Sequence, residues 1–181
     1  MGKTEVGVAR KSAPRVHAVD MIMACLRQES IYKTLDYRNK SEAYIKEYMH
    51  QPLQGTVREI LRFLQPDVQE TTISRKARGA LLWEGDVTTT VNNIRFLGVQ
   101  HRPDFVVKVG GMRIAVEVKR GETGSAVREG IGQSLAYAGC GDFDFVTYLF
   151  IDTSRDKKIA ESTHRDATAE AFIESLWRHY N

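Results

Sequence analysis

An aspartate, a glutamate and a lysine in the middle of the chain have types and spacing that suit metal chemistry. Asp104 begins one run of β-branched residues, and Glu117 and Lys119 lie in the next, with Gly110-Gly111 between the two runs. A two-glycine turn is typical of a β-hairpin, because both central positions of a type I′ turn need positive φ. Such a turn fixes the register of the two strands and places Asp104 directly opposite Glu117.

The predicted hairpin has one apolar and one polar face. On the apolar face Phe105 lies opposite Val116, and Val107 lies opposite Ile114. The polar face holds Asp104, Val106, Lys108, Arg113, Ala115, Glu117 and Lys119. Two carboxylates directly opposite each other destabilise a strand pair, so this face suits a bound cation.

Oxygen ligands at this density favour Mg²⁺ or Mn²⁺ over zinc, since the sequence has no Cys or His cluster nearby. Such an ion can hold a phosphate oxygen and lower the pKa of a bound water molecule. Lys119 would then orient that water or stabilise the charge that develops on the phosphate.

Composition excludes several classes of protein. The 181 residues carry 26 Lys and Arg against 23 Asp and Glu, a net charge of +3 that is too small to indicate nucleic-acid binding by itself. This surplus belongs to residues 1–16, which we expect to form a solvated arm, with an arm that contacts DNA as the alternative. Two cysteines without CxxC spacing predict no disulfide framework or zinc site and a reducing, cytoplasmic setting. No apolar run approaches the ~20 residues that cross a bilayer, so we expect no membrane partner.

The hydrophobic pattern predicts helices first, then strands, a helix, a strand and a last helix, which is an α/β or α+β domain. Ser12 caps the first expected helix, which has Val16 and Leu26 on its apolar face, and Ser41 caps a short second one. The remaining expected elements are a helix at 54–64 stopped by Pro66, strands within 67–100 that include a hairpin around Asn92-Asn93, a helix at 125–138, a buried strand at 143–151 and a helix at 169–180. In the expected 125–138 helix, Val127, Ile131, Leu135 and Ala138 form the apolar face. We expect two parts: an N-terminal tail and helical extension at 1–50, and a catalytic-type domain at 51–181.

Pro103-Asp104 followed by Glu117-Val118-Lys119 resembles the motif of the PD-(D/E)xK nuclease superfamily. The resemblance implies a restriction-endonuclease-like αβββαβ core, with a central mixed sheet flanked by helices. It makes Asp104 and Glu117 the metal-binding carboxylates, Lys119 the catalytic lysine and the Val118 carbonyl a further ligand.

A second motif lies downstream. Gln133 and Tyr137 form a Gln-x-x-x-Tyr pattern that is similar to the RecB-type branch of this superfamily, and residues 102–137 resemble the nuclease domain of type I restriction motor subunits. The resemblance places Gln133 near the active site and Tyr137 near the DNA backbone. Residues four apart share one face of a helix, which for this pair lies away from the expected apolar stripe.

Two glutamates compete for a further role at the metal site. Glu59 lies off the apolar face of its expected helix, and Holliday-junction resolvases and similar nucleases place a glutamate on the helix before the first core strand. We therefore expect Glu59 to be a metal ligand, with a solvated helix glutamate as the alternative. Glu84, which follows the apolar residues 81–83, is the second choice, and His101 is interpreted as an ordinary histidine at a strand end.

The combined expectation is a Mg²⁺-dependent (or Mn²⁺-dependent) deoxyribonuclease that acts as an endonuclease. Candidates to contact the phosphate backbone, besides Tyr137, are Lys108, Arg113, Arg120 and Arg128. One alternative is a nuclease-fold subunit that binds nucleic acid or a partner without independent catalysis, and another is a structural domain whose motif is fortuitous. DNA is the expected partner, together with a second copy of the chain or a larger DNA-processing complex.

Overall fold

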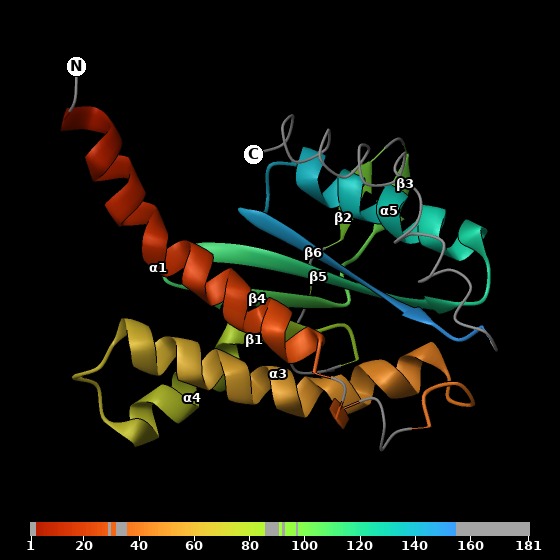
Figure 1. The fold of residues 1–181 in the computed structure, drawn as a ribbon, viewed down its shortest axis with the longest axis horizontal. Coiled ribbons are helices and arrows are strands. Elements are labelled where there is room, and N and C mark those ends of the chain that lie inside the picture. The colour runs from red at the N-terminus through yellow and green to blue at the C-terminus, as the bar shows by residue number, and fades with distance from the viewer. Residues whose placement is uncertain are drawn as a thin grey trace.

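The computed structural model describes residues 3–28, 30–31, 36–85, 91, 93–96 and 98–154. This part of the chain is a mixed α/β structure (Figure 1). Its elements are, in order, α1 (Lys3–Leu26), α3 (Glu42–Leu64), α4 (Glu70–Ala80), β1 (Leu81–Trp83), β2 (Ile94–Phe96), β3 (Val99–His101), β4 (Phe105–Val109), β5 (Met112–Gly121), α5 (Gly124–Gly139) and β6 (Phe145–Asp152). None of the helices in the described ranges is long and apolar enough to cross a membrane.

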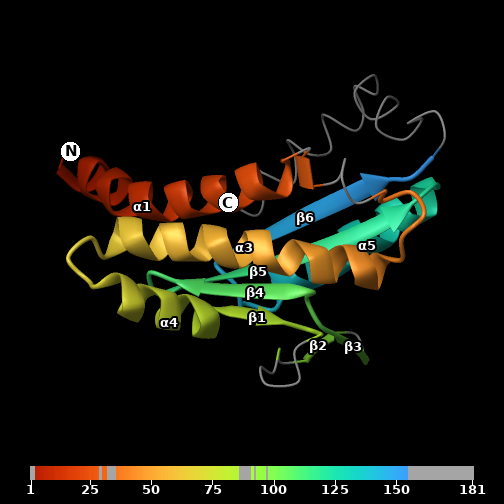
Figure 2. The same cartoon turned by 90° about the horizontal axis from the view of Figure 1, so that it is seen from below.

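The main sheet has the strand order β1-β4-β5-β6. Strand β4 is antiparallel to both β1 and β5, whereas β6 runs parallel to β5. A parallel pair needs a crossover connection, and α5 supplies it. Strands β2 and β3 form a separate two-stranded sheet. Helices α1, α3 and α4 lie on one side of the main sheet and α5 lies on the other (Figures 1 and 2).

The Gly-Gly hairpin is confirmed, including its register. Gly110 and Gly111 have φ values of 57° and 76°, and the strand pairs run from Val109 opposite Met112 to Phe105 opposite Val116. Alternation of side chains then puts the odd-numbered residues of β4 toward α3 and leaves the other face toward α5.

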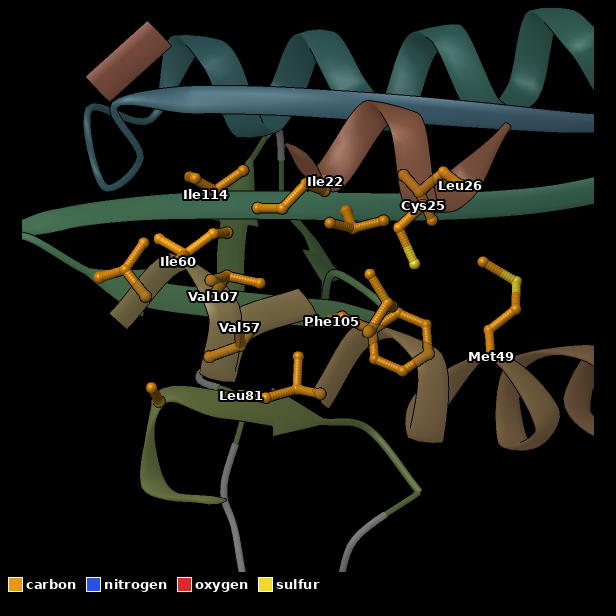
Figure 3. Packing of buried hydrophobic residues seen from close by; sticks show 14 of the residues in the cluster. Ile22, Cys25, Leu26, Met49, Val57, Ile60, Leu81, Phe105, Val107 and Ile114 are labelled. Carbon is orange, nitrogen blue, oxygen red and sulfur yellow. The ribbon is translucent and has the colours of Figure 1, made fainter. Parts of the chain in front are cut away.

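The main hydrophobic core lies between the sheet and the helices on its first face (Figure 3). Buried side chains come from α1, α3 and the strands, and include Ile22, Leu26, Ile45, Met49, Val57, Ile60, Leu81, Phe105, Val107 and Ile114. Residues before and after position 50 therefore pack in one core.

Helix α3 replaces the two helices that the sequence predicts on either side of Pro52. The hydroxyl oxygen of Ser41 caps it as expected and accepts a hydrogen bond from the Tyr44 amide at 3.2 Å. The helix then continues through Pro52 to Leu64. Its buried residues, Ile45, Met49, Leu53, Val57, Ile60 and Leu61, form one continuous stripe. Burial of that stripe outweighs the cost of an internal proline.

The expected strands within residues 67–100 are wrong in part, because residues 70–80 form helix α4. Thr71, Thr72 and Ile73 have strand propensity, but Ile73, Ala77 and Ala80 are buried at helical spacing, and tertiary packing overrides propensity. Strand β2 pairs with β3 on either side of Gly98, which has a φ of 79°. The predicted hairpin around Asn92-Asn93 falls partly outside the described residues. Residues 88–90, Asn92 and the expected helix at 169–180 lie outside the described residues.

Helix α1 begins at Lys3 instead of Ser12, so most of the expected solvated arm is helical. The buried residues of its described side chains are Ala18, Ile22, Cys25 and Leu26, whereas Val16 is exposed. Arg15, which belongs to the basic segment, lies 3.7 Å from the Asp144 carboxylate just before β6.

In helix α5 the predicted apolar residues Val127, Ile131 and Leu135 are half-buried, and the fully buried residues lie beside them. Gly130, Ala136 and Tyr137 are buried, whereas Ala138 is exposed. The close approach occurs at Gly130, where an added Cβ atom would overlap the Tyr148 ring on β6.

This approach predicts opposite effects for two alanine substitutions in α5. Gly130→Ala should destabilise the protein by about 1–3 kcal/mol because the helix or the Tyr148 ring must move. Gly132→Ala should stabilise it by up to about 1 kcal/mol, because its Cβ would meet nothing within 4 Å and alanine favours helix. Urea unfolding of the two proteins measures both effects, and equal stabilities would contradict the packing of α5 on β6.

Candidate functional site

Three carboxylates lie in one row across neighbouring strands at one end of the main sheet. Glu84 directly follows β1, and its amide donates to the Asp104 carbonyl at 3.0 Å. Asp104 directly precedes β4, and Glu117 lies within β5. The register of the hairpin, extended one step beyond Phe105 and Val116, places Asp104 opposite Glu117, as the sequence predicts.

Both facing carboxylates are buried. Asp104 is 3% exposed and Glu117 is 2% exposed. Oδ2 of Asp104 accepts a hydrogen bond from the Val118 amide at 2.7 Å, so a side chain continues the ladder where β4 has ended. Oε2 of Glu117 accepts a hydrogen bond from the Tyr137 hydroxyl at 3.2 Å. Each carboxylate is therefore held in place by a hydrogen bond from a different element.

Burial makes it costly for both groups to carry a negative charge. Burial, together with the charge of Asp104, raises the pKa of Glu117 from 4.5 to about 7. Burial also raises the pKa of Asp104, against the opposing effect of Lys46. A cation between the two groups would stabilise their ionised forms.

Lys46 from α3 lies among three carboxylates. Its Nζ is 2.6 Å from Oδ1 of Asp104, 3.3 Å from Oε1 of Glu42 and 3.8 Å from Oε2 of Glu84. Burial lowers the pKa of this ammonium, but Asp104 and Glu42 outweigh that effect and hold the pKa above its ordinary value.

Lys119 occupies the corresponding position beside Glu117. Its Nζ is 3.5 Å from Oε1 of Glu117, 3.6 Å from Oε1 of Glu129 and 3.9 Å from Oε1 of Glu42. Burial lowers its pKa, while the surrounding carboxylates, led by Glu42, raise it to a net value above the ordinary one. Glu42 is thus shared between the two lysines.

No family model, curated protein or solved structure matches this chain.

The residues present fit a hard divalent cation in their chemistry. Carboxylate oxygens of Asp104 and Glu117 with the Val118 carbonyl make an all-oxygen donor set of the kind that Mg²⁺ and Mn²⁺ prefer. The raised pKa values of the two carboxyl groups agree with a site that needs a cation. Within the described ranges, no three His, Cys, Asp or Glu side chains are arranged so that they hold a metal as they stand, and Oδ1 of Asp104 is in contact with Lys46.

The structure does not bring Glu59 to this cluster. Glu59 and Lys46 lie 13 residues apart on α3, which is about 20 Å along the helix. Glu59 is exposed, and its charge adds to the larger effect of Glu70 in raising the pKa of the Arg62 guanidinium. Glu84, the second choice of the sequence analysis, lies beside Asp104 and also pairs with Arg102, whose Nη2 is 2.5 Å from its Oε1. Burial raises the pKa of Glu84, but the hydrogen bond and charge of Arg102 together with the charge of Lys46 outweigh it, so the pKa lies below its ordinary value.

Sequence reasoning missed Glu42 and Lys46. Both are on the first turns of α3, and Glu42 also accepts a hydrogen bond from the Arg120 amide at 3.2 Å. The available signal was a Glu–Lys pair four residues apart and off the apolar stripe. That signal is weak, because such pairs are common on solvated helix surfaces.

The Gln-x-x-x-Tyr residues on α5 lie over the polar face of the hairpin. Tyr137 is buried, and burial together with Glu117 raises the pKa of its hydroxyl. The Tyr137 hydroxyl therefore lies against Glu117 and not at the surface. Gln133 is half-buried, and its Oε1 atom is buried without a hydrogen-bond partner among the described residues.

The basic candidates for phosphate contact are scattered. Lys108 is exposed on β4, about 13 Å along the strand from Asp104, and it faces the half-buried Arg113 across the hairpin. Arg128 is exposed on α5. Arg120 lies nearest the cluster, and its Nη2 donates to the Arg38 carbonyl at 3.0 Å.

Proposed function

We propose that the protein is a divalent-cation-dependent nuclease that hydrolyses DNA phosphodiester bonds. The observation that carries this proposal is the pair of buried, facing carboxylates, Asp104 and Glu117, with Lys119 beside Glu117. The main-sheet elements follow the order helix, three strands, helix, strand, and this order supports the resemblance to the restriction-endonuclease-like fold.

Asp104, Glu117 and the Val118 carbonyl would hold Mg²⁺ or Mn²⁺. When bound, the ion would polarise a phosphate oxygen and lower the pKa of water. The chain's own groups would do the rest. Lys119 would donate hydrogen bonds to the attacking water or to the phosphate oxygens, Tyr137 would keep Glu117 oriented, and Glu42 would position Lys119.

Burial of Asp104 and Glu117 strengthens the electrostatic interactions on which this mechanism depends. Charges act more strongly in a site from which water is excluded. The Lys119 side chain is 17% exposed, so it can reach a substrate while it contacts the buried Glu117. Arg120, next along β5, is the basic residue best placed to bind the flanking phosphate.

The test is a cleavage assay on matched single-stranded, duplex and branched DNA and on RNA of the same sequence. We expect cleavage of DNA with Mg²⁺ or Mn²⁺ and none with EDTA. Asp104→Asn keeps the size of the side chain and removes a ligand charge, so it should reduce cleavage at least about 10²-fold. Equal cleavage by Asp104→Asn and wild-type protein would contradict the assignment.

A second candidate function is a nuclease-fold subunit that binds nucleic acid or a partner without catalysis. The observation that favours it is the ion pair between Lys46 and Asp104, which compensates the aspartate without a metal. This function predicts DNA binding that weakens with salt, is unaffected by EDTA and is accompanied by no cleavage with either cation.

A further inference from the structure

The Lys46 ammonium occupies a position that suits a cation. Three carboxylates surround it, and each comes from a different part of the fold: Glu42 from α3, Glu84 from the end of β1 and Asp104 from the start of β4. The Lys46 side chain is 15% exposed and that of Asp104 is 5% exposed. This is a mostly buried, multiply paired ammonium, unlike a solvated lysine on a helix surface.

Burial explains why Asp104 needs this partner. An ionised carboxylate that is removed from water without a counter-charge is strongly destabilising. Lys46 provides that counter-charge at 2.6 Å. The Val118 amide uses the other oxygen of Asp104, Oδ2.

A divalent ion and the ammonium would compete for Oδ1 of Asp104. An ion bound there would lie about 2 Å from the oxygen, where its charge and the ammonium would repel each other. Glu42 and Glu84 already lie 3.3 Å and 3.8 Å from Nζ, so the ammonium has other acceptors within a short movement.

We propose that Lys46 is a displaceable counter-cation: it neutralises Asp104 in the metal-free protein and moves toward Glu42 and Glu84 when a divalent cation binds. This inference rests on the proposed metal site at Asp104 and Glu117. It assigns Lys46 a role distinct from that of Lys119, which pairs with Glu117 and not with Asp104. Lys46 thereby keeps the empty site compensated and lowers its affinity for the metal.

The first test measures Mn²⁺ affinity by calorimetry for the wild type, Lys46→Met and Lys76→Met. Methionine is unbranched and one atom shorter than lysine, so it keeps most of the side chain and removes the charge. Lys76 is an exposed lysine of α4 whose Nζ donates to Gln65. We expect Lys46→Met to bind Mn²⁺ at least about fivefold more tightly than the wild type, and Lys76→Met to match the wild type.

The outcomes separate the two proposals. If the wild type binds Mn²⁺ and Lys46→Met binds it with equal or weaker affinity, the counter-cation role of Lys46 is overturned and the proposed metal site is retained. Absence of Mn²⁺ binding in all three proteins overturns both.

A second measurement uses only wild-type protein, so it does not depend on the folding of a variant. Acylation of lysines by an amine-reactive reagent, followed by mass spectrometry, should label Lys46 several-fold faster with saturating Mg²⁺ than with EDTA, because the ammonium leaves its closest ion pair. Labelling of Lys76 should not change. A Lys46 rate that is unchanged or lower with Mg²⁺ would overturn the proposal.

Discussion

The Lys119→Ala protein should cleave DNA about 10²–10³-fold more slowly than the wild type at saturating Mg²⁺, which is the usual loss when one preorganised donor to a developing charge is removed. Lys119 is the ammonium next to Glu117, with Nζ 3.5 Å from Oε1. It is part of strand β5, where it pairs with Phe150 of β6. Cleavage rates on the best DNA substrate measure the effect.

The same variant should retain its metal affinity. Lys119 is a cation, so its removal leaves Glu117 more negative and does not weaken the attraction for a divalent ion. Calorimetric titration with Mn²⁺ therefore separates a chemical role from a role in metal binding. Lys76→Ala removes an equal charge far from the cluster and is the matched control. Wild-type cleavage by Lys119→Ala would show that this lysine has no part in the reaction.

The Glu117→Gln protein should lose part of the pH dependence of folding stability. In the unfolded chain this carboxyl titrates near 4.5, whereas burial and the charge of Asp104 raise its pKa to about 7 in the folded protein. Between these values the folded state binds more protons than the unfolded state, so the free energy of unfolding falls as pH rises. The destabilisation is absent below pH 4.5 and reaches about 3 kcal/mol above pH 7.

Urea unfolding at several pH values in EDTA measures this effect. The free energy of unfolding of the wild type minus that of Glu117→Gln should fall by about 3 kcal/mol between pH 4 and pH 8. Glu122→Gln, at an exposed position just after β5, is the control and should show a constant difference from the wild type. Mg²⁺ should restore wild-type stability at pH 8 through binding to the folded state. If the difference in free energy of unfolding between the wild type and Glu117→Gln does not change with pH, folding does not raise the pKa of Glu117.

The hairpin could be predicted from the sequence because every determinant of it is local. A two-residue turn with positive φ at Gly110 and Gly111 fixes the register, and alternation of apolar and polar residues fixes the faces. The meeting of Asp104 and Glu117 follows from these two facts. Tyr137 over Glu117 also follows in part, since residues four apart share a helix face.

The other half of the cluster could not be predicted because it depends on long-range packing. Lys46 reaches Asp104 only because α3 continues through Pro52 and lies along the sheet with its first turns at the end that carries the carboxylates. The hydrophobic pattern predicts one helix that ends before Pro52 and another that begins after it, whereas α3 is continuous and carries Glu59 far from the end that reaches Asp104. Helix α4 was missed for a related reason: its β-branched residues have strand propensity, and burial of one face decides against it.

Strand β5 pairs with β4 as far as Val116 and with β6 from Ile114 to Gly121, and the Asp104 carboxylate accepts from the Val118 amide where β4 has ended. Amide hydrogens in such a central strand exchange with solvent through global unfolding rather than through local opening. The candidate site therefore lies on the strand whose amide hydrogens we expect to exchange most slowly. Its geometry should survive fluctuations that fray the ends of the helices, and it should disappear only when the whole fold is lost.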